Sequence, residues 1–207
     1  MNRAKPELSH FPPANRSDPR NMTARCILAP LSPPDDLRGQ VTPADWAAAA
    51  DLPPRRRAEY LTWRAVVYRE LGAVQIGYND DGAPVLIGDP RRIGVSHSGG
   101  YVAVAISDRR CAVDIEPVTR NFARAASRFL NSAEAALSDD PRLPGVVWCA
   151  KETLYKYAGE PGLELLRDLT VERIDFAAGE IEGRIRGGEP IPLRLELRDG
   201  LIVVYTL

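Results

Sequence analysis

Cysteine and histidine are scarce in this chain of 207 residues, which has three cysteines and two histidines. Cys26, Cys111 and Cys149 lie far apart in apolar segments, and no C-x-x-C pair is present. An odd number of widely spaced cysteines argues against a disulfide framework, and the missing close spacing argues against a zinc site. We therefore expect reduced, mostly buried thiols in a cytoplasmic protein.

Long apolar runs and an excess of charge of one sign are also missing. No stretch is apolar and long enough to cross a bilayer, and the first residues lack the apolar core of a signal peptide. The chain has 27 Lys and Arg against 28 Asp and Glu, a formal net charge of −1. No overall field therefore draws it to nucleic acid or to a membrane, and we expect neither as a partner.

The chain divides into a leader and two halves. Residues 1–21 are polar and proline-rich without periodicity, and they are predicted to be a disordered leader. Met22 precedes the first strand-like run, TARCILAPL, and is a candidate for the natural start. Residues 22–118 and residues 119–207 are the two predicted halves, and in each of them helices come before most of the strands.

One long helix is predicted in each half. Residues 53–72 and residues 145–159 each carry apolar side chains at helical spacing and end at a glycine. Shorter helices are predicted to follow Thr42 and Asn131, both of which are good N-cap residues.

The other apolar runs predict antiparallel strands joined by turns. Because strands and helices do not alternate as βαβ units, an α+β fold is favoured over a doubly wound sheet. The similar order of elements predicts two halves related by a pseudo-twofold axis, each a helix packed on a small antiparallel sheet, with the active site between them. The runs are AVQIGY, APVLIG, IGVSHS, YVAVAIS, CAVDIE, LTVERIDF, EIEGRIR, IPLRLELR and LIVVYTL.

Two carboxylates lie two residues apart in the run CAVDIE. On a strand, Asp114 and Glu116 share one face, where their like charges raise each other's pKa. A cation relieves this repulsion, and oxygen ligands without nearby cysteine or histidine suit Mg²⁺ or Mn²⁺. The alternative is a solvated polar face of an edge strand.

The second long helix offers a third carboxylate and a cation. Glu152 would face Asp114 and Glu116 across the cleft between the halves, and Lys156, one turn later, would face an anion held by the metal. The alternative is an ordinary surface ion pair of Glu152 and Lys156, which contributes about 0.3–0.5 kcal/mol.

His97 lies in the segment VSHSGGYV, between Ser96 and Ser98. Hydroxyl groups and closely spaced backbone N–H groups suit a phosphate oxygen. A serine-hydrolase triad is not indicated, because the segment lacks the G-x-S-x-G turn. The alternative is a histidine whose hydrogen bonds are satisfied within the turn.

A basic cluster opens the first long helix. Arg57 and Arg64 are two helical turns apart and share a face, and a helix N-terminus that carries cations is well suited to bind an anion such as phosphate. The alternative is a solvated basic surface. The cluster comprises Arg55, Arg56, Arg57, Arg64 and Arg69.

The segments SHSGGYVAVAIS, VDIE, RFLNSAEAA and WCAKETLYK, in this order, resemble the 4′-phosphopantetheinyl transferases. The resemblance is to the larger monomeric type with two fused halves, and it covers roughly residues 22–207. It implies that Asp114, Glu116 and Glu152 bind Mg²⁺, and that Glu152 also helps to deprotonate the attacking serine.

The resemblance also implies the contacts to coenzyme A, which is the substrate of such enzymes. Lys156 is expected near its phosphates, His97 and Ser96 are expected to contact a phosphate, and Arg57 and Arg64 are expected to hold the nucleotide phosphates. Two departures concern affinity for coenzyme A. Ala83 stands where the family commonly has lysine, and Ala112 stands where it commonly has glycine.

The implied reaction moves the phosphopantetheine arm of coenzyme A to a serine of an apo acyl or peptidyl carrier protein. The segment from Leu163 to Arg167 is a candidate docking patch for this partner. An alternative function is a non-catalytic module that binds coenzyme A or the carrier protein. A metal-dependent nuclease fits less well, because the chain has no basic stripe with interleaved aromatic residues.

Overall fold

The computed structural model describes residues 24–207, so the predicted leader and Met22 lie outside the described residues. The long helices and the strands occur where the sequence predicts them. None of the helices in this part of the chain combines the length and apolar character needed to cross a membrane. The α-helices are α1 Pro43–Ala48, α2 Pro54–Leu71, α3 Ser132–Ala135 and α4 Leu143–Ala158, and short 3₁₀ helices span Pro34–Leu37 and Ala126–Arg128.

The strands form three antiparallel sheets, as an α+β fold requires. The first sheet has the order β1-β5-β4 and the second sheet has the order β6-β10-β9-β8-β7, while β2 and β3 form a separate hairpin. The strands are β1 Arg25–Pro30, β2 Gln75–Tyr78, β3 Pro84–Ile87, β4 Arg92–Ser98, β5 Tyr101–Ser107, β6 Val113–Pro117, β7 Leu169–Asp175, β8 Glu180–Ile185, β9 Ile191–Arg198 and β10 Leu201–Thr206.

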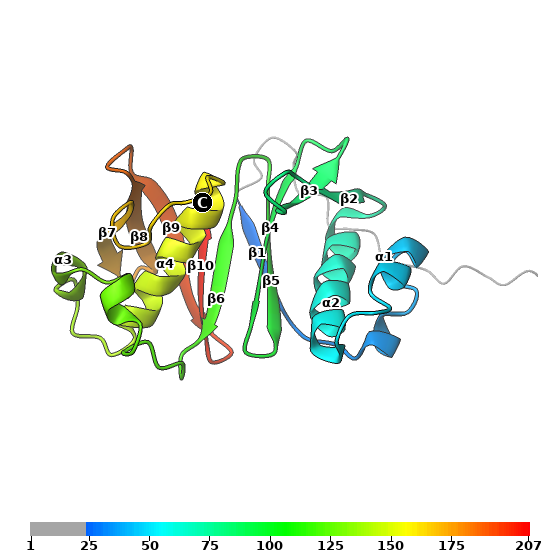
Figure 1. Ribbon diagram of the computed structural model, residues 1–207, viewed down its shortest axis with the longest axis horizontal. Helices are drawn as coiled ribbons and strands as arrows, with labels where there is room; N and C mark the ends of the chain where they lie inside the picture. Colours follow the sequence, from blue (N-terminus) through cyan, green and yellow to red (C-terminus); the bar gives the residue numbers. More distant parts are fainter. Residues whose placement is uncertain (1–23) are drawn as a thin grey trace, which may run out of the picture.

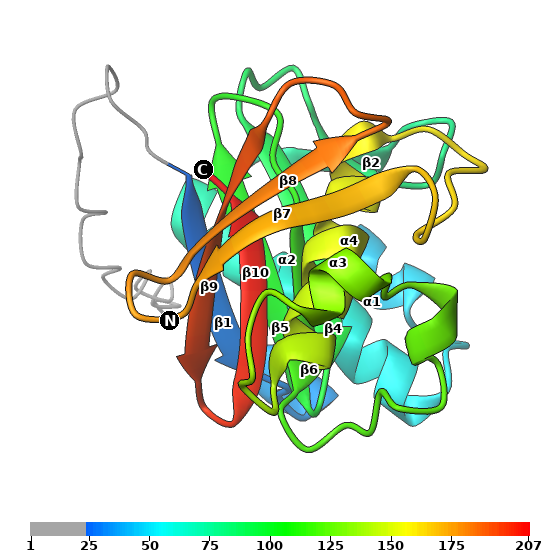
Figure 2. The ribbon, with the colours of Figure 1, turned by 90° about the vertical axis from the view of Figure 1, so that its left-hand side faces the viewer.

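The two larger sheets lie next to each other, with α2 on the outer side of the first sheet and α4 over the second sheet, whose strands β7 and β8 lie farther out (Figure 1). Helix α2 packs on the first sheet, and α4 packs on the second sheet, whose strands lie side by side in Figure 2. Apolar side chains of β5, β6 and β10 fill the space between the sheets; they include Ala103, Ala105, Val113, Ile115, Leu201 and Val203.

Local sequence explains where these elements begin and end. Proline occupies the first turn of both long helices, and glycines with positive φ, Gly72 and Gly159, follow their last residues. Gly99 and Gly100 also have positive φ, of 58° and 83°, and they make the tight turn between β4 and β5. This turn places the Ser-His-Ser segment at the end of β4.

Strand β6 lies within residues 22–118, which we assigned to the first half. It pairs with β10 at the edge of the second sheet, with Asp114 opposite Val204. Its other side lies against β4, where the Ile115 N–H donates to Ser96 Oγ at 3.3 Å. The acidic strand therefore lies where the two sheets meet.

Candidate active site

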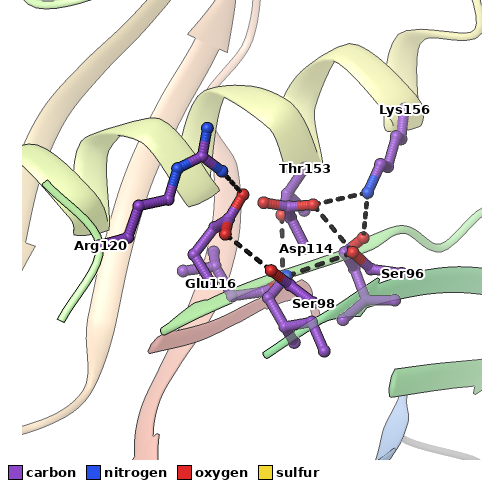
Figure 3. A network of polar contacts seen from close by, with 10 residues as sticks. Ser96, Ser98, Asp114, Glu116, Arg120, Thr153 and Lys156 are labelled. Carbon is purple, nitrogen blue, oxygen red and sulfur yellow. Dashed lines mark hydrogen bonds and ion pairs between the residues drawn. The ribbon is translucent and has the colours of Figure 1, made fainter. Parts of the chain in front are cut away.

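Asp114 and Glu116 project from β6 toward the serines of β4 (Figure 3). Ser96 Oγ donates to Asp114 Oδ1 at 2.9 Å, and Ser98 Oγ donates to Glu116 Oε2 at 2.8 Å. The two acidic residues are only 6% and 8% exposed. The alternative of a solvated strand face is therefore wrong, and both carboxylates belong to a largely buried polar site.

Each of these carboxylates has its own cationic partner. Lys156 of α4 places Nζ 2.6 Å from Asp114 Oδ1 and 3.1 Å from the Val113 carbonyl oxygen. Arg120, which follows β6, forms an ion pair with Glu116. Lys156 therefore reaches across from the helix to the acidic strand, where its ion-pair partner is Asp114 and not, as the alternative of a surface pair required, Glu152. That Lys156 faces an anion held by a metal ion stays a prediction.

Glu152 is the third carboxylate of the cluster, one helical turn before Lys156. Burial raises its pKa above the ordinary value, and the charge of Asp114 raises it further, partly offset by Lys156. Burial likewise raises the pKa of Glu116, with a smaller contribution from Asp114. Among residues 24–207, the Glu152 side chain has no hydrogen bond or ion pair. The carboxylates of Asp114, Glu116 and Glu152 are near enough for their negative charges to repel one another, as the raised pKa values of Glu116 and Glu152 indicate.

The donor atoms of this cluster fit a divalent cation such as Mg²⁺. Asp114 Oδ2 is buried and has no hydrogen-bond partner among residues 24–207, which leaves a lone pair available for a cation. All the donors are oxygens, the kind that hard cations prefer. In the part of the chain that the structure describes, no three acidic, histidine or cysteine side chains already converge closely enough to hold a metal ion.

His97 faces away from the acidic cluster, because neighbouring residues of a strand point to opposite sides. It borders a pocket of about 330 Å³ together with Arg55, Arg56 and Glu59 of α2. His97 Nε2 lies 3.5 Å from a terminal nitrogen of Arg56. The buried Glu59 accepts from Arg55 Nε at 3.0 Å and lies 3.5 Å from His97 Nδ1. Two arginines and an imidazole thus surround one carboxylate.

Arg64, which we predicted to bind phosphate, does not border the pocket at His97. It is 2% exposed, and its guanidinium donates to Asp45 at 2.9 Å and to the Tyr78 hydroxyl at 2.6 Å. Arg57 lies on the same face, with its guanidinium 4.8 Å from the centre of the Trp46 ring. Their shared face therefore packs against α1, and the arginines that border the pocket at His97 are Arg55 and Arg56.

Lys151 is a residue to which we gave no role from the sequence. Its Nζ is completely buried and donates to the Phe129 carbonyl oxygen at 2.6 Å and to Glu134 at 2.8 Å. Glu134 also accepts from the backbone N–H groups of Asn131 and Val171, each at 3.0 Å. Lys151 therefore fixes α4 to its surroundings, and with it the positions of Glu152 and Lys156 on the same helix.

Comparison with known families matches part of the chain. Residues 110–202 match the family model described as the 4′-phosphopantetheinyl transferase superfamily. No curated protein matches the chain. The matched span contains all three carboxylates and Lys156, whereas His97 and α2 lie before it. It thus supports a transferase of the phosphopantetheinyl class in general.

Proposed function

We propose that this protein transfers the 4′-phosphopantetheine group of coenzyme A to a serine hydroxyl of an apo acyl or peptidyl carrier protein. The products are the holo carrier protein and adenosine 3′,5′-bisphosphate. We assign it to the larger monomeric type, with pseudo-twofold halves and the site between them. The observation that carries the proposal is the meeting of Asp114, Glu116, Glu152 and Lys156 at the junction of the two sheets, within the matched span.

The acidic cluster needs a cation before it can receive a diphosphate, because carboxylates and phosphates repel each other. Asp114, Glu116 and Glu152 would hold Mg²⁺, or Mn²⁺, through their oxygens. The ion would neutralise the diphosphate oxygens of coenzyme A and make the phosphorus a better electrophile. Oδ2 of Asp114, which is buried and has no hydrogen-bond partner in the described part of the chain, is the atom that best supports this assignment.

Two side chains of α4, Lys156 and Glu152, would stabilise the phosphate charge and accept the serine proton. The Lys156 ammonium group lies in the acidic cluster and would stabilise negative charge on the phosphate during transfer. Glu152 would accept the proton of the attacking serine. A carboxylate whose pKa is raised by burial and by Asp114 is a better base than an ordinary one.

The pocket at His97 would bind a second phosphate of coenzyme A. Coenzyme A carries a diphosphate and a separate phosphate on its ribose, and β4 has the acidic cluster on one side and Arg55, Arg56 and His97 on the other. Bound coenzyme A would therefore cross the end of β4, with one of its phosphates in each place. Ser96 already bonds to Asp114 and to the Ile115 N–H, so we assign it to orienting Asp114 rather than to binding coenzyme A.

The carrier protein would dock beside the second half. In the segment that we predicted for docking, Leu163 is buried and packs in the core, whereas Leu166 is exposed. The exposed Arg167 forms ion pairs with Glu164 and Asp168. The proposed patch is therefore limited to Leu166 and Arg167, an apolar group next to a cation.

Product formation tests the proposed function. Purified protein is incubated with Mg²⁺, coenzyme A and each of several apo carrier proteins, and adenosine 3′,5′-bisphosphate is quantified by chromatography. We expect release that requires Mg²⁺ and matches the amount of holo carrier protein formed. No release with any carrier protein would contradict the proposal. Coenzyme A binding that is indifferent to Mg²⁺ would then indicate a non-catalytic binding module.

The His97 pocket makes a separate prediction. Arg56→Ala removes a guanidinium from the pocket and should raise the dissociation constant for coenzyme A about tenfold, a loss of about 1.4 kcal/mol. Isothermal titration calorimetry measures this directly. Arg69→Ala is the matched control, because Arg69 is exposed on the same helix and pairs with Glu70. Equal affinities of the two variants would rule out a phosphate contact at Arg56.

A further inference from the structure

Arg120 has no place in the mechanism above, yet it lies in direct contact with the acidic cluster. It follows β6 and pairs with Glu116 Oε1, while Ser98 donates to the other oxygen of the same carboxylate (Figure 3). The Glu116 side chain is 10% exposed and that of Arg120 is 45% exposed. A half-exposed cation thus engages a nearly buried carboxylate that the proposed function assigns to the metal.

The Arg120 guanidinium also rests on an aromatic surface. Its Cζ is 5.0 Å from the centre of the Phe122 ring and 5.3 Å from that of the Trp148 ring, within the range of cation–π attraction. Arg120 borders a pocket of about 210 Å³ between the segment after β6 and the start of α4. The guanidinium therefore has favourable contacts that do not depend on Glu116.

The other cation of the cluster is held differently. Lys156 bonds both to Asp114 and to the Val113 carbonyl oxygen, so two acceptors keep its ammonium group in place. Arg120 has Glu116 as its carboxylate partner, and a divalent cation that binds the same carboxylate repels an adjacent guanidinium. Binding of the ion and of Arg120 to Glu116 must therefore oppose each other, and such coupling is reciprocal.

We propose that Arg120 is a counter-cation that competes with the divalent metal ion for Glu116 and withdraws onto Phe122 and Trp148 when the ion binds. It is a positioning residue that keeps the acidic cluster neutralised until the ion arrives. This inference rests on the proposed function, because it assumes that Glu116 is a metal ligand.

Metal binding without coenzyme A tests the inference. The full chain is titrated with Mn²⁺ by calorimetry as wild type, as Arg120→Gln and as Arg142→Gln. We expect Arg120→Gln to bind Mn²⁺ about tenfold more tightly than wild type, since its competitor is gone. Arg142 borders the same pocket but pairs with Asp140, so Arg142→Gln should bind like wild type. A variant that merely damaged the site would bind more weakly.

Trp148 fluorescence supplies a second readout. In wild type, Mn²⁺ should change the emission of Trp148, taken as the difference from a Trp148→Phe variant, and this change should disappear in Arg120→Gln. If wild type binds Mn²⁺ and Arg120→Gln binds it equally or more weakly, the proposal that Arg120 competes with the metal ion is wrong, whereas the proposed metal site is retained. If neither protein binds Mn²⁺, the metal site itself is wrong, and the inference falls with it.

Discussion

Glu152→Gln should lower the rate of phosphopantetheine transfer by about 10³-fold, because the amide can neither accept the serine proton nor supply a negative metal ligand. The substitution keeps the size and shape of a half-buried side chain, so we expect the variant to remain folded. Initial rates of holo carrier formation at saturating Mg²⁺ and coenzyme A measure the effect.

Glu160→Gln is the control for that experiment. Glu160 follows α4 and forms an exposed ion pair with Arg186 at 2.9 Å, outside the acidic cluster. Its variant should keep the wild-type rate. If Glu152→Gln retains more than about a tenth of the wild-type rate, a role for Glu152 as base or metal ligand is excluded, since removal of a general base typically costs at least about 10²-fold.

Lys151→Met should lower the free energy of unfolding by about 3–5 kcal/mol, because it leaves Glu134 buried without its counter-charge. Burial lowers the pKa of Lys151, while the hydrogen bond and charge of Glu134 oppose that shift. The charged forms of Lys151 and Glu134 therefore stabilise each other, and the removal of either one leaves the other as a buried, unpaired charge. Urea unfolding followed by circular dichroism measures the difference.

Two further variants show whether charge is the cause. Adding Glu134→Gln to Lys151→Met removes the stranded charge and keeps an acceptor for the backbone N–H groups, so part of the lost stability should return. Arg173→Met breaks an exposed pair with Glu180 and should cost less than about 1 kcal/mol. A loss below about 1 kcal/mol for Lys151→Met would show that the buried pair does not hold α4 in place.

The predictions that succeeded rest on local signals. Thr42 and Asn131 each make a capping box with the acidic residue three positions later, and the two long helices end at glycines with positive φ. The spacing of Asp114 and Glu116 places them on one face of a strand in any sheet. Such features are fixed by a few neighbouring residues, so the sequence alone reveals them.

The features that the sequence did not predict depend on contacts between distant segments. The sheet to which β6 belongs is decided by pairing with β10, about 90 positions later in the chain, and no local pattern encodes that partner. Arg64 has the right spacing for the basic face of α2. However, α1 covers this face, and the Arg64 guanidinium forms an ion pair with Asp45 of α1. Glu59 lies three positions after Arg56 and four after Arg55. This spacing on a helix is a local signal from which its ion pairs with the two arginines could have been predicted.

Intact mass spectrometry of carrier proteins tests the central claim most directly. Each apo carrier protein is incubated with Mg²⁺, coenzyme A and either wild-type protein or Asp114→Ala. With wild type, at least one carrier protein should gain the mass of one phosphopantetheine group, and with Asp114→Ala the same carrier protein should keep its apo mass. The account is contradicted if no carrier protein gains this mass, or if Asp114→Ala loads the carrier protein as fast as wild type.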